Sequence, residues 1–367
     1  MSKKNSLLPS GFADVLPPLA AQESRTVARL MNDFRRFGYE QVKPPIMEFE
    51  SSLLDDSSLG IGQQTFRVMD PESQEMMAIR ADMTTQINRI ASTRLKDEPR
   101  PLRICYTGQV LRVKGEGLYA ERQLAQTGAE LIGVENAEAD AESLIIAVNS
   151  VNNLGIKNIS VDISLPTLPK ILGAGSDLLS AISRKDMAAI KRRAGKNSEK
   201  YLALAAANNI SALEKISKQK ISKQAADLIK RVLQIHKLVK AKLPSLNITF
   251  DLLEHRGFEY YSGFSFSIFC SKNNEELGRG GRYTIGRTGE TGCGFSLSTN
   301  AILRSLPKKK PRAKILVPQN TSLEKITALQ KEGLITICSL SDKDQNKNAK
   351  KLGCKFILVN GKKTIVK

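Results

Sequence analysis

The chain has no tryptophan and only two histidines, His236 and His255, among its 367 residues. No two cysteines form a Cys-x-x-Cys pair, and their number is odd. Metal centres and Ser-His-Asp triads depend on histidine or on clustered cysteine, so neither is expected here. Free thiols in a reducing cytosol are the simplest interpretation of the cysteines. The five are Cys105, Cys270, Cys293, Cys338 and Cys354.

Long apolar runs are also missing. No stretch of about 18 apolar residues occurs, so no membrane span is expected. The N-terminal residues 1–6 lead to Pro9 without the apolar core of a signal peptide. These absences favour a cytoplasmic protein.

The composition is that of a globular protein, with 41% apolar and 25% charged residues. The length suggests two or three domains. The proline- and lysine-rich stretch 307–312 is the best linker, and alternating strand and helix patterns after it predict a small α/β domain over 313–367. Before it, we expect a strand-rich core over 1–164 and 246–306, interrupted by a helical insertion over 165–245.

The insertion carries most of the net charge of +19. Residues 170–242 contain 17 Lys/Arg against 5 Asp/Glu. Tyr201 is the one aromatic residue there, so stacking platforms for bases are nearly absent. A solvated lysine-rich helix face is favoured over nucleic-acid binding, and an acidic protein partner is a third possibility. Apolar residues at helical spacing from Ala225 to Leu243, with Ser222 as N-cap, predict the longest helix of this segment.

Three segments of the core carry side chains that can bind a small zwitterion. The run 255–263 holds Arg256, Glu259, Tyr260 and Tyr261, which offer a guanidinium for a carboxylate and phenols for a polar ring. Taken alone, Arg256 and Glu259 could form a surface pair, and the tyrosines could be strand-packing residues.

The other two segments are 77–84, with Asp82 and Thr84, and 126–130, with Gln126 and Glu130. Gln126 and Glu130 lie four residues apart in a strand pattern and therefore face the same side. Asp82 could instead cap a helix that starts near Thr84, and Glu130 could be a surface residue. The polar stretch 114–123 between two strand patterns predicts a hairpin loop.

Together and in order, these motifs resemble the histidyl-tRNA synthetase family of class II synthetases, which includes the regulatory subunits of ATP phosphoribosyltransferase. The opening segment 11–17 and the run 280–283 match the same family. The resemblance covers nearly all of about the first 300 residues. It implies an α+β fold: a class II synthetase-like antiparallel sheet with flanking helices, a helical insertion and a small C-terminal α/β domain.

The resemblance also assigns roles in histidine binding. Asp82, Thr84 and Gln126 would hold the α-ammonium, and Glu130 would accept an imidazole N–H. Arg256 would bind the carboxylate, and Tyr260 and Tyr261 would line the ring pocket. Arg112, in the motif 2 position, completes the set. No catalytic residue, metal or cofactor is expected.

Three departures separate the chain from charging synthetases. In the family's motif 3, a glutamate and an arginine stand where this chain has Asn300 and Ala301. The arginine contacts ATP phosphates, and its loss removes on the order of 2–5 kcal/mol of stabilisation. In the motif 2 loop, Ala120 stands where the synthetase has another arginine. The 55 residues of the C-terminal domain are also few for an anticodon-binding domain.

We therefore expect a non-catalytic regulatory subunit of ATP phosphoribosyltransferase, required for activity and histidine feedback in the first step of histidine biosynthesis. The implied partners are the short-form catalytic subunit and L-histidine as effector, in a homodimer within a hetero-octamer. Two alternatives stay open: an active histidyl-tRNA synthetase with degenerate motif 3, and an RNA-binding paralogue that uses the basic insertion.

Overall fold

The computed structural model describes residues 8–54, 62–116, 120–219, 221–254, 260–286, 288–307, 310–341 and 344–366. The chain divides into two units, Met1–Leu306 and Pro307–Lys367. Within the described ranges, no helix combines the length and apolarity that a membrane crossing needs.

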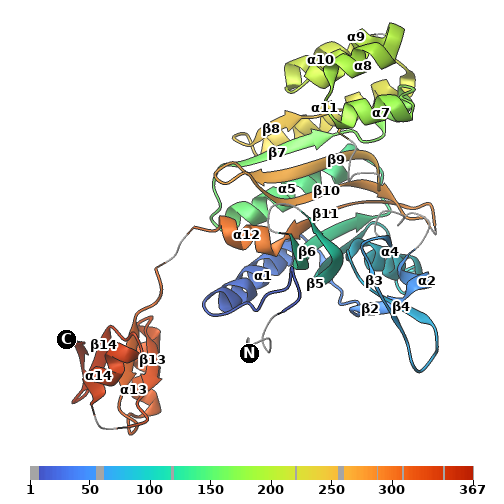
Figure 1. Cartoon of the computed structure of the whole chain (residues 1–367). Helices are drawn as coiled ribbons and strands as arrows, with labels where there is room; N and C mark the ends of the chain where they lie inside the picture. Colours follow the sequence, from blue (N-terminus) through green and yellow to red (C-terminus); the bar gives the residue numbers. More distant parts are fainter. Residues whose placement is uncertain are drawn as a thin grey trace, which may run out of the picture. The chain divides into compact units, whose positions relative to one another are not determined.

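The first unit is built on an eight-stranded sheet (Figure 1). Its inner pairings, from β5 through β6, β11, β10 and β9 to β7, are antiparallel, and the outer pairs β1–β5 and β7–β8 are parallel. This confirms the predicted antiparallel sheet. The strands are β1 (Glu40–Gln41), β5 (Leu102–Glu116), β6 (Glu121–Ile132), β7 (Ile159–Ser164), β8 (Asn247–Phe250), β9 (Tyr261–Cys270), β10 (Glu275–Thr284) and β11 (Thr291–Ser298).

Helices cover both faces of this sheet. On one face, α1 (Leu19–Arg36), α5 (Ala137–Asn153) and α12 (Thr299–Ser305) share a core with inward-facing strand residues such as Phe295. On the other face, α4 (Thr84–Thr93) contributes Ile87 to a smaller core. The alternation of strand side chains therefore separates a structural face from the face that α4 covers.

A small three-stranded sheet lies beside α4, with the order β2-β4-β3. Its elements are β2 (Met47–Phe49), the short helix α2 (Glu50–Leu53), β3 (Phe66–Met69) and β4 (Met76–Ile79). Pro44 and Pro45 fall between β1 and β2, which fits the prolines' inability to donate to a strand ladder.

The predicted hairpin loop over 114–123 is too long. Strand β5 continues to Glu116 and β6 already starts at Glu121, after a register irregularity between Leu111 and Glu116. Backbone pairing can extend through polar residues on a solvated hairpin, so side-chain polarity alone overestimated the loop.

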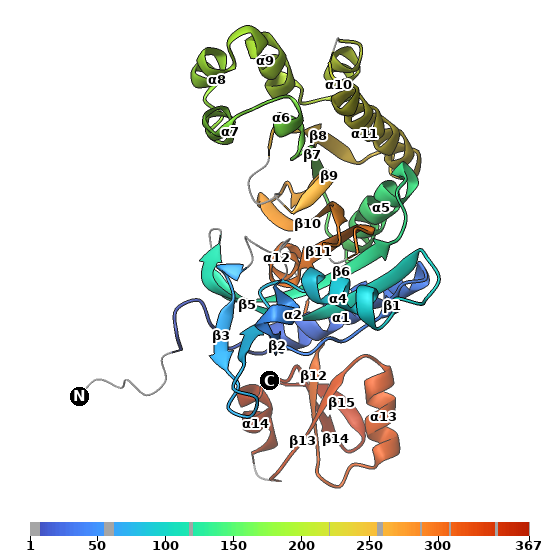
Figure 2. The same cartoon turned by 90° about the vertical axis from the view of Figure 1, so that its right-hand side faces the viewer.

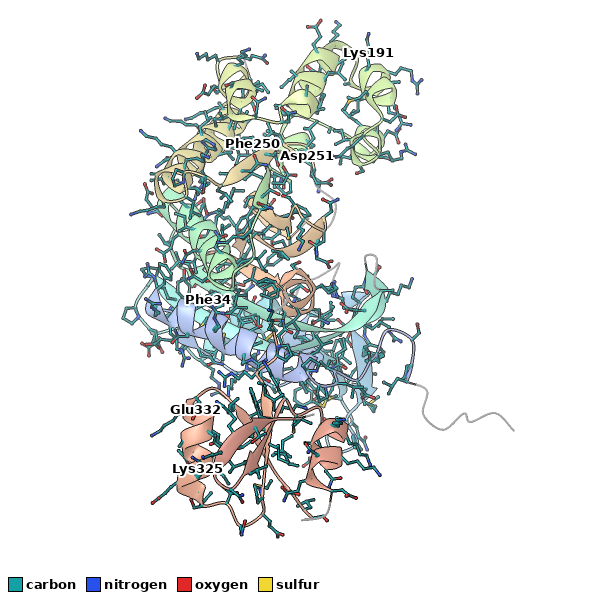
Figure 3. The ribbon with its side chains drawn as sticks, turned by 90° about the vertical axis from the view of Figure 1, so that its left-hand side faces the viewer. Phe34, Lys191, Phe250, Asp251, Lys325 and Glu332 are labelled. Carbon is teal, nitrogen blue, oxygen red and sulfur yellow. The ribbon has the colours of Figure 1, made fainter. Side chains whose placement is uncertain are left out.

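A run of helices, here called the insertion helices, connects β7 to β8 (Figure 2). In α11, the apolar stripe that includes Ile229, Val232 and Ile235 is fully buried, and Ser222 accepts the N–H of Ala225, which confirms the predicted N-cap. Lys191 and other basic residues of these helices are exposed (Figure 3). The helices are α6 (Leu168–Ile171), α7 (Ser176–Ser183), α8 (Met187–Ala194), η2 (Gly195–Asn197), α9 (Ser198–Ala206), α10 (Ile210–Ser217) and α11 (Lys223–Lys242).

The second unit is a four-stranded sheet with the order β13-β12-β14-β15. Three strands are parallel, and β15 pairs antiparallel with β14. The sequence analysis did not predict β15. Its turn is Asn360-Gly361, both at positive φ, the dipeptide preferred in two-residue hairpins. The elements are β12 (Lys314–Val317), α13 (Leu323–Lys331), β13 (Ile335–Cys338), α14 (Gln345–Lys351), β14 (Phe356–Val359) and β15 (Lys362–Ile365).

Replacing Phe34 by alanine should destabilise the first unit strongly. The side chain is fully buried, and its ring meets that of Phe295 edge-on at 5.3 Å (Figure 3). Loss of this packing should lower the unfolding free energy by about 3–5 kcal/mol in urea denaturation. Phe37, which follows α1 and is 44% exposed, is the control, and Phe37→Ala should cost less than about 1 kcal/mol. Equal losses in both variants would contradict this assignment of the core.

Candidate functional site

The carboxyl group of Glu130 lies at the centre of a polar cluster on the α4 side of the sheet. The residue is 2% exposed, so its interpretation as a surface residue is wrong. Its Oε2 accepts the Tyr283 hydroxyl at 3.0 Å, and its Oε1 accepts the hydroxyls of Tyr106 at 3.2 Å and Thr84 at 3.3 Å. The three donors come from β10, β5 and α4, and each of them is uncharged.

The space for this carboxyl group depends on glycine. Gly294 on β11 pairs directly with Glu130, and a Cβ at position 294 would lie 1.7 Å from Glu130 Oε2. Gly128, two residues before Glu130, leaves room for the ring of Tyr106 in the same way. Any side chain at these positions would collide with the polar groups. The region around Glu130, Tyr106 and Tyr283 is here called the Glu130 cavity.

Asp82 and Gln126 form a second part of the cluster. Gln126 Nε2 donates to Asp82 Oδ2 at 2.8 Å, and Gln126 Oε1 accepts the N–H of Met83. Asp82 Oδ1 accepts the N–H of Thr84 at 2.8 Å at the start of α4, so Asp82 also serves the helix terminus. Asp82 and Thr84 are half-buried.

Tyr260, Tyr261 and Tyr283 line one side of this site, here called the tyrosine wall. The ring of Tyr260 stacks on Tyr283 with centroids 4.9 Å apart and meets Tyr261 edge-on at 5.5 Å. Asn88 Nδ2 donates to the Tyr260 hydroxyl at 3.0 Å. Burial first, and then the Glu130 charge, raise the pKa of Tyr260 and Tyr283 well above 10. These phenols therefore stay neutral hydrogen-bond donors near neutral pH.

Burial also raises the pKa of Glu130 to about 8, although the hydrogen bonds from Tyr283 and Tyr106 oppose the rise. The nearby Asp82 charge adds to it. A carboxyl group with this pKa holds a proton through much of the neutral range, so it can donate to a ligand as well as accept from one.

Of the two predicted site arginines, Arg112 is among the described residues and Arg256 is not. Arg112 on β5 lies against the segment before Asp82, with its Nε 3.5 Å from the Ala81 carbonyl oxygen. Arg256 lies outside the described residues, together with His255 and Glu259. The structure therefore brings together seven of the eight predicted site residues: Asp82, Thr84, Arg112, Gln126, Glu130, Tyr260 and Tyr261.

Sequence reasoning missed Tyr106 and Asn88 and left Tyr283 out of the site set. Tyr106 pairs with Gly128 across β5 and β6. A large residue opposite a glycine signals a filled cavity, but this signal can be read only once the strand register is known.

The motif 3 region offers no cation to the cavity. Ala301 is 1% exposed in the core, and Asn300 Oδ1 accepts the N–H of Ala125. Arg304, the nearest arginine, pairs with Glu275 at 2.6 Å and Glu121 at 2.9 Å.

Arg122 of the motif 2 loop is engaged as well. It donates to the carbonyl groups of Arg112 and Ser10, and its guanidinium lies 5.0 Å from the ring centres of Phe12 and Phe66. The polar groups around Glu130 offer donors and acceptors to a small polar molecule. Arg122 and Arg304, in contrast, are committed to structural contacts.

In the described ranges, no group of three or more His, Cys, Asp and Glu side chains could hold a metal ion. The five cysteines are free, and only Cys338 among them is exposed.

The raised pKa of Glu130 makes a prediction about stability. The folded protein keeps a proton that the unfolded chain, with a glutamate pKa of 4.5, releases. The unfolding free energy should therefore fall as pH rises from about 5 to about 8, by up to about 1.4 kcal/mol per unit, and level off above.

Urea denaturation of the wild type and of Glu130→Gln over this range checks the prediction. The variant cannot lose the proton and should show a flatter profile. Glu72→Gln on the surface is the control and should follow the wild type. A parallel pH dependence in Glu130→Gln and wild type would rule out a protonated, buried Glu130.

The comparisons of this chain with a family model, with related sequences and with solved structures agree with one another. A family model described as histidyl-tRNA synthetase matches residues 11–302. An ATP phosphoribosyltransferase regulatory subunit of Paramagnetospirillum magneticum is 43% identical, with 97% of each chain covered. One from Rhodospirillum centenum is 40% identical over 99% of this chain and 97% of its own.

Solved structures share the fold. An ATP phosphoribosyltransferase regulatory subunit/histidyl-tRNA synthetase from Bacillus halodurans has a TM-score of 0.79 and 20% identity, covering 95% of this chain and 97% of that one. Histidyl-tRNA synthetase from Nostoc has a TM-score of 0.76 and 18% identity, covering 97% and 92%. The chain belongs to the histidyl-tRNA synthetase family and, within it, to the ATP phosphoribosyltransferase regulatory subunits.

Proposed function

We propose that this chain regulates an ATP phosphoribosyltransferase and supplies no catalytic residue itself. One observation carries the proposal: seven of the eight predicted amino-acid-binding residues lie together in the described part of the chain, whereas the motif 3 position offers no cation for a phosphate. Position 301 holds a buried alanine, and Arg304 is tied to two glutamates. Phosphate activation needs cations on the phosphates, and Arg112 of motif 2 is left without its motif 3 counterpart.

The proposed effector is L-histidine. Its α-ammonium would lie among Asp82, Gln126 and Thr84, whose oxygens are acceptors at the start of α4. Its imidazole would meet Glu130, which can accept from or donate to a ring nitrogen because its pKa lies near neutrality. Arg112 and Arg256 would bind the carboxylate, as guanidinium groups do.

The proposed partner is the short-form catalytic subunit, and the proposed assembly is a homodimer within a hetero-octamer in the cytoplasm. Exposed apolar side chains on and beside the small sheet support self-association. The side chains of Ile46, Phe49, Val68, Met69 and Met76 are each between 37% and 55% exposed there. Histidine would act by binding one state of the subunit better, with a coupling free energy of about 1–3 kcal/mol.

Neither alternative gains support. An active synthetase would need the missing motif 3 cation. An RNA-binding paralogue would need aromatic platforms on the insertion helices, but Tyr201 is 1% exposed and its hydroxyl donates to the Leu172 carbonyl oxygen. Stacking on that ring would require unfolding of the helices around it.

The function is tested by mixing the purified chain with a short-form catalytic subunit. We expect the two to elute together in size-exclusion chromatography and phosphoribosyltransferase activity to rise at least about tenfold over the catalytic subunit alone. The chain alone should catalyse no histidine-dependent ATP–pyrophosphate exchange. Exchange at an enzymatic rate, or no effect on the catalytic subunit, would overturn the proposal.

The effector is tested by calorimetry of the complex with L-histidine. Asp82→Asn removes the acceptor charge next to the expected ammonium, so affinity should fall about 10–100-fold, the loss of one charged hydrogen bond. Asp70→Asn is the control, because Asp70 accepts only from its own turn at Ser73 and Glu72. Equal affinity in Asp82→Asn and wild type would exclude this binding mode.

A further inference from the structure

A buried carboxylate joins the wall of the cavity to the insertion helices. Asp140 on α5 is fully buried. Its Oδ1 lies 2.7 Å from Nη2 and 2.8 Å from Nε of Arg282 on β10, and its Oδ2 lies 2.6 Å from Nε of Arg231 on α11. One carboxylate is thus shared by two guanidiniums, so a change at either arginine alters the interaction of the other arginine with Asp140.

Arg282 is tied directly to the tyrosine wall. A register irregularity between Gly281 and Tyr283 falls at this residue. Its neighbour Tyr283 donates to Glu130 on the cavity side, while Arg282 binds Asp140 and the Val134 carbonyl oxygen on the other side. A displacement of the β10 backbone at Tyr283 also displaces the neighbouring Cα of Arg282, and with it the base of the side chain that binds Asp140.

The guanidinium of Arg231 has fewer hydrogen bonds than that of Arg282. Its Nη2 is buried and has no hydrogen-bond partner among the residues that the structure describes. A buried donor without a partner costs on the order of 1–3 kcal/mol, so a small shift of α11 that brought Nη2 to a partner would be favourable. The Arg231 end of the contact therefore has a second arrangement available to it.

The structure also leaves room for such a shift. A pocket of about 670 Å³ lies between α11, α6 and the start of α5, and Arg231, Leu228 and Glu138 are among the residues that line it. Close-packed helices cannot move independently, but a helix beside an open pocket can slide or turn.

We propose that Asp140 is a positioning residue that transmits occupancy of the Glu130 cavity to the insertion helices. A ring that enters beside Tyr260 and Tyr283 displaces β10 at Arg282. Asp140 moves with Arg282, and Arg231 then changes its hydrogen-bond partners. This change shifts α11. The basic surface of the insertion helices then carries the state of the cavity to a partner. The proposal rests on the proposed function for the identity of the ligand, L-histidine.

The chain offers a matched control. Lys185, between α7 and α8, pairs with Asp251 at 2.6 Å, which makes a second ion pair between the insertion and the core. Asp251 is labelled in Figure 3. Asp251 follows β8, the edge strand of the sheet, and β7 and β9 lie between β8 and β10. Lys185→Met therefore removes a more exposed ion pair of the insertion helices without cutting the proposed connection.

The test is hydrogen exchange of the full chain with and without millimolar L-histidine, together with calorimetry. In the wild type and in Lys185→Met, histidine should change exchange in both β10 and α11. In Arg231→Met, histidine should still bind within about twofold and still change β10, because Asp140 and Arg282 remain a balanced pair. The change in α11 should fall at least about fivefold, the lower end of typical coupling.

A second arm needs no ligand. Tyr283→Phe removes the bond to Glu130 and should alter exchange in α11 of the free protein, and adding Arg231→Met should abolish that effect. The proposal is overturned if Tyr283→Phe leaves hydrogen exchange in α11 unchanged. It is also overturned if histidine changes exchange in α11 equally in Arg231→Met and in the wild type. Absence of histidine binding in calorimetry would instead count against the effector, and the Tyr283→Phe arm would still decide the connection.

Discussion

The structure depends on one costly feature: a carboxyl group, Glu130, placed in the interior with only neutral hydroxyl donors around it. Burial of a carboxyl without a cation is unfavourable, and it is tolerated here because the group keeps its proton and because three hydroxyls are held in place by three different elements. Glycines on the neighbouring strand and on β6 itself leave the space that these groups need. Such a site is prepared for a polar ligand that brings its own hydrogen-bonding groups.

The rest of the cavity is asymmetric in its chemistry. Acceptors and aromatic rings are present on the side formed by α4, β6 and β10, whereas Arg122 and Arg304 are committed to glutamates, carbonyl groups and rings of the same chain. A guanidinium already paired in this way is a poor phosphate ligand, because its existing contacts would have to be broken first. Loss of activation chemistry therefore involves both a replaced residue, Ala301, and the reassignment of nearby charges.

The buried Asp140 gives the basic insertion helices a structural role beyond their charge. Shared ion pairs in the interior contribute little net stability, yet they fix the relative positions of the elements that they join. Here the joined elements are the strand that carries Tyr283 and the helix that carries Arg231. The remaining basic residues lie largely on the solvated side, as lysine-rich helix faces do.

Local patterns were enough to predict the Ser222 cap, the buried stripe of α11, the antiparallel sheet and the family, because spacing and short motifs are properties of neighbouring residues. They could not reveal that Tyr106 and Tyr283 converge on Glu130, that Asp140 serves two arginines, or that β15 forms. The first two depend on strand register and on contacts between residues far apart in the chain. The third follows a local signal, the Asn360-Gly361 turn, which the sequence reasoning overlooked. The sequence by itself determined which side chains were available. The tertiary structure decided which of them became neutral, paired or accessible, because burial and distance set the strength of every polar interaction.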